Sequence, residues 1–321
     1  MHLPRAAGAA TLRVSVTDRC NLRCAYCMPE EGVPLLPRSE IPPLAELASA
    51  VAWLVERYGV DRVKVTGGEP LVRCGVAEFV AAVVAIPGVT EVSMTTNGTR
   101  LPDAAREMAK AGLARLNVSL DTVDPGRFRE LTRGGRVEEV LAGIDAALAA
   151  GLTPLKLNSV LRRSTFREDV PALLGYAAEK GVEIRFIELM QTGTEAAWAL
   201  AERVAGSAVR EWLEAQGADL APLPARPNAP ARRTAINWNG REVLAGWIDP
   251  VSQAFCEDCD RLRLDARGRL RRCLMDDQAF PLVDLLRRGE AHVAEAAADY
   301  VARKQAPVAM TSGSTMASIG G

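Results

Sequence analysis

Short β-like segments alternate with helical stretches through the first 190 residues, and this alternation constrains the fold more than any other feature of the chain. Six segments have the composition of strands, at residues 12–17, 62–68, 92–98, 116–121, 155–160 and 183–189. Ala- and Leu-rich runs with helical periodicity, such as residues 44–58 and 137–150, lie between them. A strand that is repeatedly followed by a helix is typical of βα units and a parallel sheet.

Several of these predicted strands carry a polar residue at every second position. A parallel strand with helices on both faces would be an almost continuous apolar run. The polar sets are Arg13, Ser15 and Thr17; Arg62, Lys64 and Thr66; Asn117, Ser119 and Asp121; and Lys156 with Asn158. Because alternate side chains of a strand point to opposite faces, each set shares one face. We therefore predict a partial (βα)6 barrel, similar to a TIM barrel, with a polar interior; half-exposed edge strands are the alternative.

Cations stand inside three of the apolar strands. Only five of the 39 basic residues are lysines, and two of these, Lys64 and Lys156, lie within predicted strands, as does Arg185. A buried cation needs an anion or water. A bound phosphate would satisfy all three, and pairing with strand carboxylates such as Glu183 or Asp121 is the alternative.

The pattern changes after about residue 195. Residues 221–233 are Pro-rich, and residues 234–248 form a predicted hairpin with an Asn-Gly turn at 239–240. We therefore expect a barrel core at residues 1–195 and a smaller C-terminal region at residues 196–321.

Composition excludes several classes of function. A formal net charge of −1 argues against a nucleic-acid-binding protein, and no apolar run reaches the ~18–20 residues of a membrane span. The N-terminus lacks the apolar segment of a signal peptide, so we expect a cytoplasmic protein. With only His2 and His292, a histidine-based catalytic triad is also disfavoured.

Six of the seven cysteines fall into two triplets: Cys20, Cys24 and Cys27, and Cys256, Cys259 and Cys273. Such clustering favours metal ligation over disulfides, and Cys74 is interpreted as an ordinary thiol. Three thiolates spaced as CxxxCxxC can hold three irons of a [4Fe–4S] cluster and leave the fourth iron open for an exogenous ligand. A zinc site with a fourth ligand elsewhere is the alternative.

The first triplet, with Tyr26 before its last cysteine and "TGGEP" at 66–70, resembles the radical S-adenosylmethionine (SAM) superfamily. That resemblance implies that SAM chelates the open iron and is cleaved to a 5′-deoxyadenosyl radical. The second triplet, in "FCEDCDRLRLDARGRLRRC", and the terminal "IGG" resemble one family within it, the GTP 3′,8-cyclases (MoaA proteins), which begin molybdenum cofactor biosynthesis.

The resemblance implies roles for particular residues. The two triplets would hold two [4Fe–4S] clusters, and the open iron of the second would receive the guanine of GTP. The SAM-binding residues would be Tyr26, Gly68, Ser119 and Met190. The GTP-binding residues would be Arg13, Lys64, Thr95, Lys156, Arg185, Arg261 and Arg263. The C-terminal Gly320 and Gly321 would enter the active site and support catalysis.

The implied reaction is a radical cyclisation of GTP, in which a hydrogen is taken from C3′ of the ribose and C3′ then bonds to C8 of the guanine. The resemblance also implies an external one-electron donor, a homodimer, and transfer of product to the next pathway enzyme, cyclic pyranopterin monophosphate synthase. A radical SAM maturase that acts on a peptide and an iron–sulfur electron carrier without turnover are the alternative functions.

Overall fold

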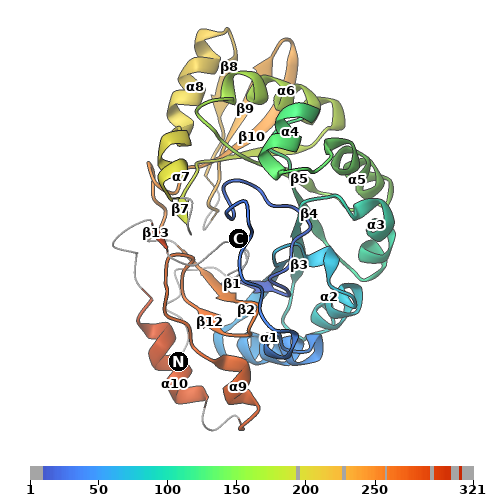
Figure 1. The fold of residues 1–321 in the computed structure, drawn as a ribbon, viewed down its shortest axis with the longest axis vertical. Helices are drawn as coiled ribbons and strands as arrows, with labels where there is room; N and C mark the ends of the chain where they lie inside the picture. Colours follow the sequence, from blue (N-terminus) through green and yellow to red (C-terminus); the bar gives the residue numbers. More distant parts are fainter. Residues whose placement is uncertain are drawn as a thin grey trace.

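Six parallel strands, each followed by helices on the outer side, form the centre of the molecule (Figure 1). The computed structural model describes residues 10–192, 196–225, 229–256, 259–289, 293–304 and 311–312. The strands are β1 Ala10–Ser15, β2 Val60–Thr66, β3 Glu91–Thr96, β4 Arg115–Ser119, β5 Leu155–Val160 and β6 Glu183–Ile187. The helices between them are α1 Leu44–Tyr58, α2 Val76–Val84, α3 Leu101–Lys110, α4 Pro125–Thr132, α5 Val137–Ala149 and α6 Phe166–Lys180. The predicted partial barrel of βα units is confirmed.

The chain after residue 195 adds strands to both edges of this sheet. Beside β6 lie β10 Arg241–Ile248, β9 Arg232–Trp238 and β8 Asp219–Pro222; beside β1 lie β11 Arg261–Leu264 and β12 Leu270–Arg271. Further helices are α7 Ala196–Glu202, α8 Gly206–Ala215, α9 Leu282–Leu286 and α10 Ala294–Ala302, and β7 Gln191–Thr192 pairs with β13 Thr311–Ser312. The C-terminal region therefore completes the main sheet from both sides.

The predicted hairpin is formed by β9 and β10, which pair in antiparallel fashion with Trp238 opposite Arg241. The two turn residues, Asn239 and Gly240, have φ angles of 52° and 76°. Positive φ at both positions is the geometry of a type I′ turn, which Asn-Gly adopts readily and which matches strand twist. The Asn-Gly prediction is confirmed.

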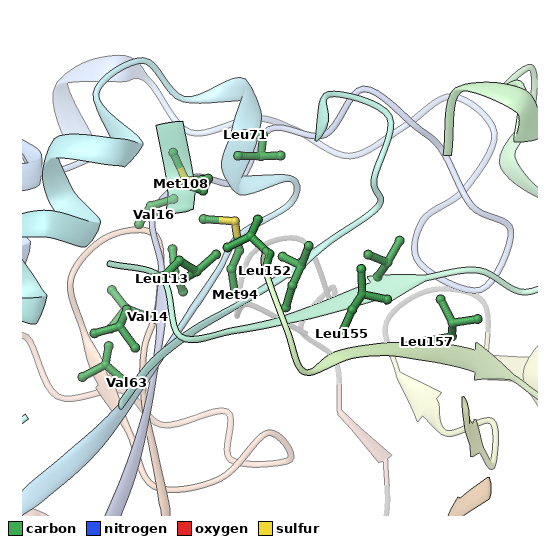
Figure 2. Packing of buried hydrophobic residues seen from close by; sticks show 14 of the residues in the cluster. Val14, Val16, Val63, Leu71, Met94, Met108, Leu113, Leu152, Leu155 and Leu157 are labelled. Carbon is green, nitrogen blue, oxygen red and sulfur yellow. The ribbon is translucent and has the colours of Figure 1, made fainter. Parts of the chain in front are cut away.

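The hydrophobic core lies between the outer face of the sheet and the helices. Outward strand residues such as Val14, Val63 and Met94 are at most 1% exposed, and Figure 2 shows them in one cluster with Met108 of α3. Full burial of a side chain of this size stabilises the fold by about 1.5–3 kcal/mol. The apolar half of each alternating strand thus attaches the helices and leaves the polar half facing inward.

Helix α1 illustrates how sequence periodicity forms this layer. Its buried residues include Leu47, Val51, Leu54 and Tyr58, which recur at intervals of three or four. This spacing places them on one face of a helix, and that face packs on the sheet.

No helix in the described part of the chain is long and apolar enough to cross a membrane.

Candidate functional site

The register of the sheet brings the predicted polar residues together on its inner side. Arg13 of β1 is paired with Lys64 of β2 and with Arg263 of β11. Two further rows cross the sheet, one of Thr95, Asn117, Lys156 and Glu183, and one of Ser119, Asn158 and Arg185. Paired residues of neighbouring parallel strands project to the same side. We call these residues, with Arg261 two positions before Arg263, the inner polar face.

The part of this face next to β11 is strongly cationic. Burial and the nearby Arg261 lower the pKa of Arg13 to about 10. Burial, together with Arg13 and Arg185, lowers the pKa of Lys64 well below its ordinary value. Among the described residues, neither Arg13 nor Lys64 forms an ion pair with a carboxylate. Both are therefore available to an anionic ligand.

Lys156 and Arg185 are held differently, because both bind one buried carboxylate. Glu183 accepts from Lys156 Nζ and from Arg185 Nε, each at 2.7 Å. The side chains of Lys156 and Glu183 are only 6% and 8% exposed. For Lys156 and Arg185, the structure therefore shows pairing with a strand carboxylate, which was the alternative to a bound phosphate. Burial alone would raise the pKa of Glu183, but Arg185 and Lys156 lower it by more.

Two amides of the inner polar face retain hydrogen-bonding capacity. The Oδ1 atoms of Asn117 and Asn158 are buried and have no hydrogen-bond partner among the residues that the structure describes. A buried unsatisfied acceptor is costly, and a ligand with N–H or O–H donors would satisfy it. Cations and free acceptors on one face suit a ligand that carries both anionic and donor groups.

The first cysteine triplet lies in the loop that follows β1, at the carboxyl ends of the strands. Backbone hydrogen bonds from Ala25 N to Leu131 O (2.9 Å) and from Arg23 N to Thr132 O (3.2 Å) attach this loop to the end of α4. On the other side, the Tyr26 hydroxyl donates to Asp121 Oδ2 at 2.8 Å. The loop is therefore anchored on both sides of the cysteines.

Burial raises the pKa of all three thiols of this triplet, that of Cys27 to about 12. For Cys24 and Cys27, other thiols of the triplet and Asp121 raise it further. Three half-buried thiols so close together become thiolates only beside a strong positive centre, which an iron–sulfur cluster supplies. Among the described residues, no group of three Cys, His, Asp or Glu is arranged to hold a single metal ion. The triplet thus fits a cluster, whose irons each take one thiolate, better than zinc.

The "GGEP" turn packs directly on the cysteine loop. Gly68 N donates to Thr17 O (2.7 Å), and Glu69 N donates to Arg19 O (2.8 Å). A Cβ atom at Gly68 would lie 2.4 Å from Arg19 O, so only glycine permits this approach. Glycine at position 68 is therefore a steric requirement of the site.

Glu69 anchors this turn to the end of β3, a role that sequence reasoning missed. Its carboxylate accepts from Thr96 Oγ1 (2.7 Å), Asn97 N (2.6 Å) and Leu71 N (3.0 Å). Burial raises the pKa of Glu69 to about 7 despite these donors. The sequence signal that could have indicated this role is the position of Glu69 within the "GGEP" motif. The other predicted SAM-binding residues are Ser119, at the end of β4, and Met190, between β6 and β7.

The second triplet lies at the opposite end of the strands. Cys259 precedes β11, whose Arg261 is level with Thr11 near the start of β1. Because β12 runs antiparallel to β11, Cys273 returns to the same end as Cys259. The long stretch of sequence between Cys259 and Cys273 therefore contains strand β11 and the antiparallel strand β12, which returns the chain to the same end. Arg13 and Arg263 lie between the levels of the two triplets.

The electrostatic surroundings of the second triplet differ from those of the first. Burial alone would raise the pKa of Cys259, but Arg261 and Lys304 lower it by more, and Arg261 Nε donates to its Sγ at 3.4 Å. Sequence reasoning missed Lys304, which also donates to Arg261 O. The pKa of Cys256 is raised by burial and by the other two thiols, and Arg261 and Lys304 offset this only in part. The two cations therefore favour a thiolate at Cys259, and a cluster bound by all three thiols fits this site. Gly320 and Gly321 lie outside the described residues.

Comparison with protein families matches two models along the chain. Residues 14–177 match the radical SAM superfamily, and residues 182–310 match Molybdenum Cofactor Synthesis C. Similar curated proteins include the GTP 3′,8-cyclase of Rhodopirellula baltica, 41% identical over 87% of this chain and 78% of that protein. The GTP 3′,8-cyclase of Pelotomaculum thermopropionicum is 44% identical over 87% and 85%. GTP 3′,8-cyclase 1 of Pseudomonas aeruginosa is 42% identical over 92% and 89%.

Among solved structures, Streptococcus suis SuiB bound to S-adenosylmethionine has a similar fold. The TM-score is 0.54 at 15% identity, over 86% of this chain and 63% of SuiB. A second SuiB structure gives a TM-score of 0.53 and is covered over 46% of its length. At this identity the likeness concerns the fold alone.

Proposed function

Because this chain belongs to the GTP 3′,8-cyclase family of the radical SAM superfamily, we propose that it converts GTP to 3′,8-cyclo-7,8-dihydro-GTP. This is the first step of molybdenum cofactor biosynthesis. The observation that carries the proposal is the cationic inner polar face between two cysteine triplets. A nucleoside triphosphate has the negative charge that these cations would neutralise.

The first triplet would hold the cluster to which SAM binds. Cluster and SAM together would supply the radical that abstracts the hydrogen. Tyr26, Gly68, Ser119 and Met190 would position SAM. The position of Gly68 supports this assignment: because glycine has no side chain, the "GGEP" turn packs directly against the cysteine loop. The second triplet, Cys256, Cys259 and Cys273, would hold the cluster that receives the guanine.

Arg13, Lys64, Lys156, Arg185, Arg261 and Arg263 would neutralise the triphosphate, with Thr95 as a neutral donor. Arginines can bind a phosphate in bidentate fashion, whereas Lys64 and Lys156 act as point charges. Glu183 already occupies Lys156 and Arg185, so a triphosphate that uses them must share them with this carboxylate. Arg13 and Lys64, which have no such partner among the described residues, are the better candidates for the dominant contacts.

We further propose, on family resemblance alone, a cytoplasmic homodimer that takes single electrons from an external donor. On the same basis, the product passes to cyclic pyranopterin monophosphate synthase, and Gly320 and Gly321 support catalysis from the C-terminal tail.

The test is an anaerobic assay of the reconstituted protein with SAM, GTP and dithionite. We expect mass spectrometry to detect 5′-deoxyadenosine and a GTP-derived isomer of unchanged mass. Cys256→Ala should abolish the isomer. Arg13→Ala should raise the KM for GTP by about 10–100-fold, since charged hydrogen bonds contribute about 1.5–3 kcal/mol. Arg136→Ala, at a side chain that is 71% exposed, is the matched control and should leave KM unchanged.

Three other outcomes would contradict the proposal in different ways. Deoxyadenosine with intact GTP would keep the radical chemistry and move the substrate elsewhere, for example to a peptide. Neither product, from protein with both clusters assembled, would exclude the cyclase. Equal KM values for GTP in Arg13→Ala and Arg136→Ala would contradict the assignment of the inner polar face as the triphosphate-binding site.

A further inference from the structure

We propose that Asp121 is a positioning residue for the first cysteine triplet, because its carboxylate anchors the cysteine loop through Tyr26 and fixes that anchor to the end of β5. The inference rests on the proposed function only in taking this triplet as a cluster site. The anchoring itself concerns contacts between residues of the chain.

The carboxylate of Asp121 joins three segments that are distant in sequence. Asp121 follows β4 and is 6% exposed. Its Oδ1 accepts from Val160 N, at the end of β5, at 2.7 Å, and its Oδ2 accepts from the Tyr26 hydroxyl at 2.8 Å. Because β5 fixes one oxygen, the other is held at a defined position for Tyr26.

Tyr26 lies between Cys24 and Cys27, so its anchor acts where two cluster ligands must be held apart. The backbone bonds of Arg23 and Ala25 restrain the loop only on the α4 side. Without the Tyr26–Asp121 bond, the backbone of Tyr26 and Cys27 would keep, among the described residues, the local bond from Cys27 N to Cys24 O, and the next residue, Met28, would stay bound at its carbonyl by Arg133 Nη1 at 2.6 Å. The hydroxyl bond therefore joins this segment to the ends of the barrel strands.

The charge of Asp121 also reaches the thiols. Arg162 is its cationic neighbour, but the Arg162 guanidinium donates to Asp169 Oδ2 at 3.1 Å, and Arg127 Nε donates to the other oxygen of Asp169 at 2.8 Å. Within the described part of the chain, the carboxylate of Asp121 thus accepts hydrogen bonds only from neutral donors, Val160 N and the Tyr26 hydroxyl. Burial raises the pKa of Asp121, and the ionised carboxylate in turn raises the pKa of Cys24 and Cys27. In its ionised form it adds negative charge near these two thiols, which should make a cluster held there harder to reduce.

Two variants separate the anchor from the charge. Tyr26→Phe removes the hydrogen bond and keeps the carboxylate, whereas Asp121→Asn removes the charge and alters the bond. In the full chain without clusters, we expect the Ala25 and Cys27 amides to exchange with solvent about tenfold faster in both variants. The double variant should exchange no faster than the more affected single variant, since both substitutions act on the same hydrogen bond.

The second measurement is the reduction potential of the first cluster, in full-length protein whose second triplet is replaced by alanine. Asp121→Asn should shift the potential positively, and Tyr26→Phe should shift it much less. Tyr176→Phe is the matched control because the Tyr176 hydroxyl has no hydrogen-bond partner in the described ranges of the chain. It should change neither exchange at the cysteine loop nor the potential.

Unchanged amide exchange in Tyr26→Phe, or additive effects in the double variant, would overturn the anchor. Equal potentials in wild type and Asp121→Asn would overturn the role of the charge. The exchange measurement needs neither cluster nor substrate, so it remains decisive even if the cyclase assay fails. Failure of the cyclase and failure of this anchor are therefore distinguishable.

Discussion

At the scale of single residues, buried carboxylates organise the cations and turns of the site. Glu183 holds Lys156 and Arg185 on the inner polar face, and Glu69 holds the "GGEP" turn on β3. The two acids have opposite pKa shifts, because Glu183 faces cations and Glu69 faces mainly neutral donors. Their contributions to stability should therefore depend on pH in opposite directions.

Glu183→Gln should lower the free energy of unfolding at pH 7 by about 3 kcal/mol, because removing one partner leaves buried charges uncompensated. The pKa of Glu183 is lowered in the folded state, so its stabilisation is complete above the ordinary value of 4.5 and is lost as pH falls below it. Urea titrations at pH 7 and pH 4 should show the difference between wild type and variant shrinking at pH 4. Glu242→Gln, at an exposed residue, is the control; equal losses in both variants would contradict the assigned role.

Glu69 should behave in the reverse sense. Its folded-state pKa of about 7 lies above the ordinary 4.5, so its contribution is fully present below pH 4.5 and is lost as pH rises through 7. The loss over this range is ~3 kcal/mol, since one pKa unit corresponds to ~1.4 kcal/mol. The free energy of unfolding of Glu69→Gln, measured from pH 4.5 to 7.5, should not show this decline. A variant with the same slope as wild type would show that another group causes it.

At the scale of elements, the site depends on the close approach of two turns. The loop after β1 carries the first triplet, and the turn after β2 lies against it at Gly68. The strands bring these turns together because β1 and β2 pair in parallel from Thr11 to Ser15. Sheet register therefore sets the position of the cysteine loop relative to "GGEP".

Gly68→Ala should separate the two turns, because the new Cβ atom would meet Arg19 O at 2.4 Å. We expect at least about 2 kcal/mol of destabilisation, within the range for strain in a packed site, and reduced iron incorporation. Gly175→Ala is the matched control, since nothing lies within 4 Å of its Cβ position in α6. That variant should be neutral or more stable by about 0.5–1 kcal/mol, as Ala favours helix. Thermal unfolding and iron analysis of both variants check this pair of predictions.

At the scale of the whole molecule, the C-terminal region protects both edges of the barrel sheet. β10 covers β6, and β11 covers β1, so the barrel strands have no free edge within the described residues. The same β11–β12 hairpin carries the second triplet to the far end of the strands. Sheet completion and assembly of the site therefore depend on the same elements.

We predict that a fragment of residues 1–195 does not fold cooperatively, because it exposes the edges of β1 and β6 to pairing with other chains. The full chain should unfold in one calorimetric transition, whereas the fragment should aggregate or lack a transition. A fragment that is monomeric and unfolds cooperatively would show that the proposed barrel core is an independent domain.

Local pattern in the sequence predicted the elements and much of the site. Alternation of polar and apolar residues identified the six strands and their inner faces, because side chains of a strand alternate between water or ligand and the core. The cysteine spacing and the Asn-Gly turn were equally readable, since each depends on a few neighbouring residues.

Tertiary structure alone decided which distant residues meet. Sheet register aligned Arg13 with Lys64 and Arg263, and the β11–β12 hairpin returned Cys273 to Cys259. The pairing of Tyr26 with Asp121, 95 residues apart, left no local signal. Sequence thus determined which way each side chain faces within its own element, because backbone stereochemistry is local. Partners across the sheet depend on strand order, register and packing, which arise only when the whole chain folds.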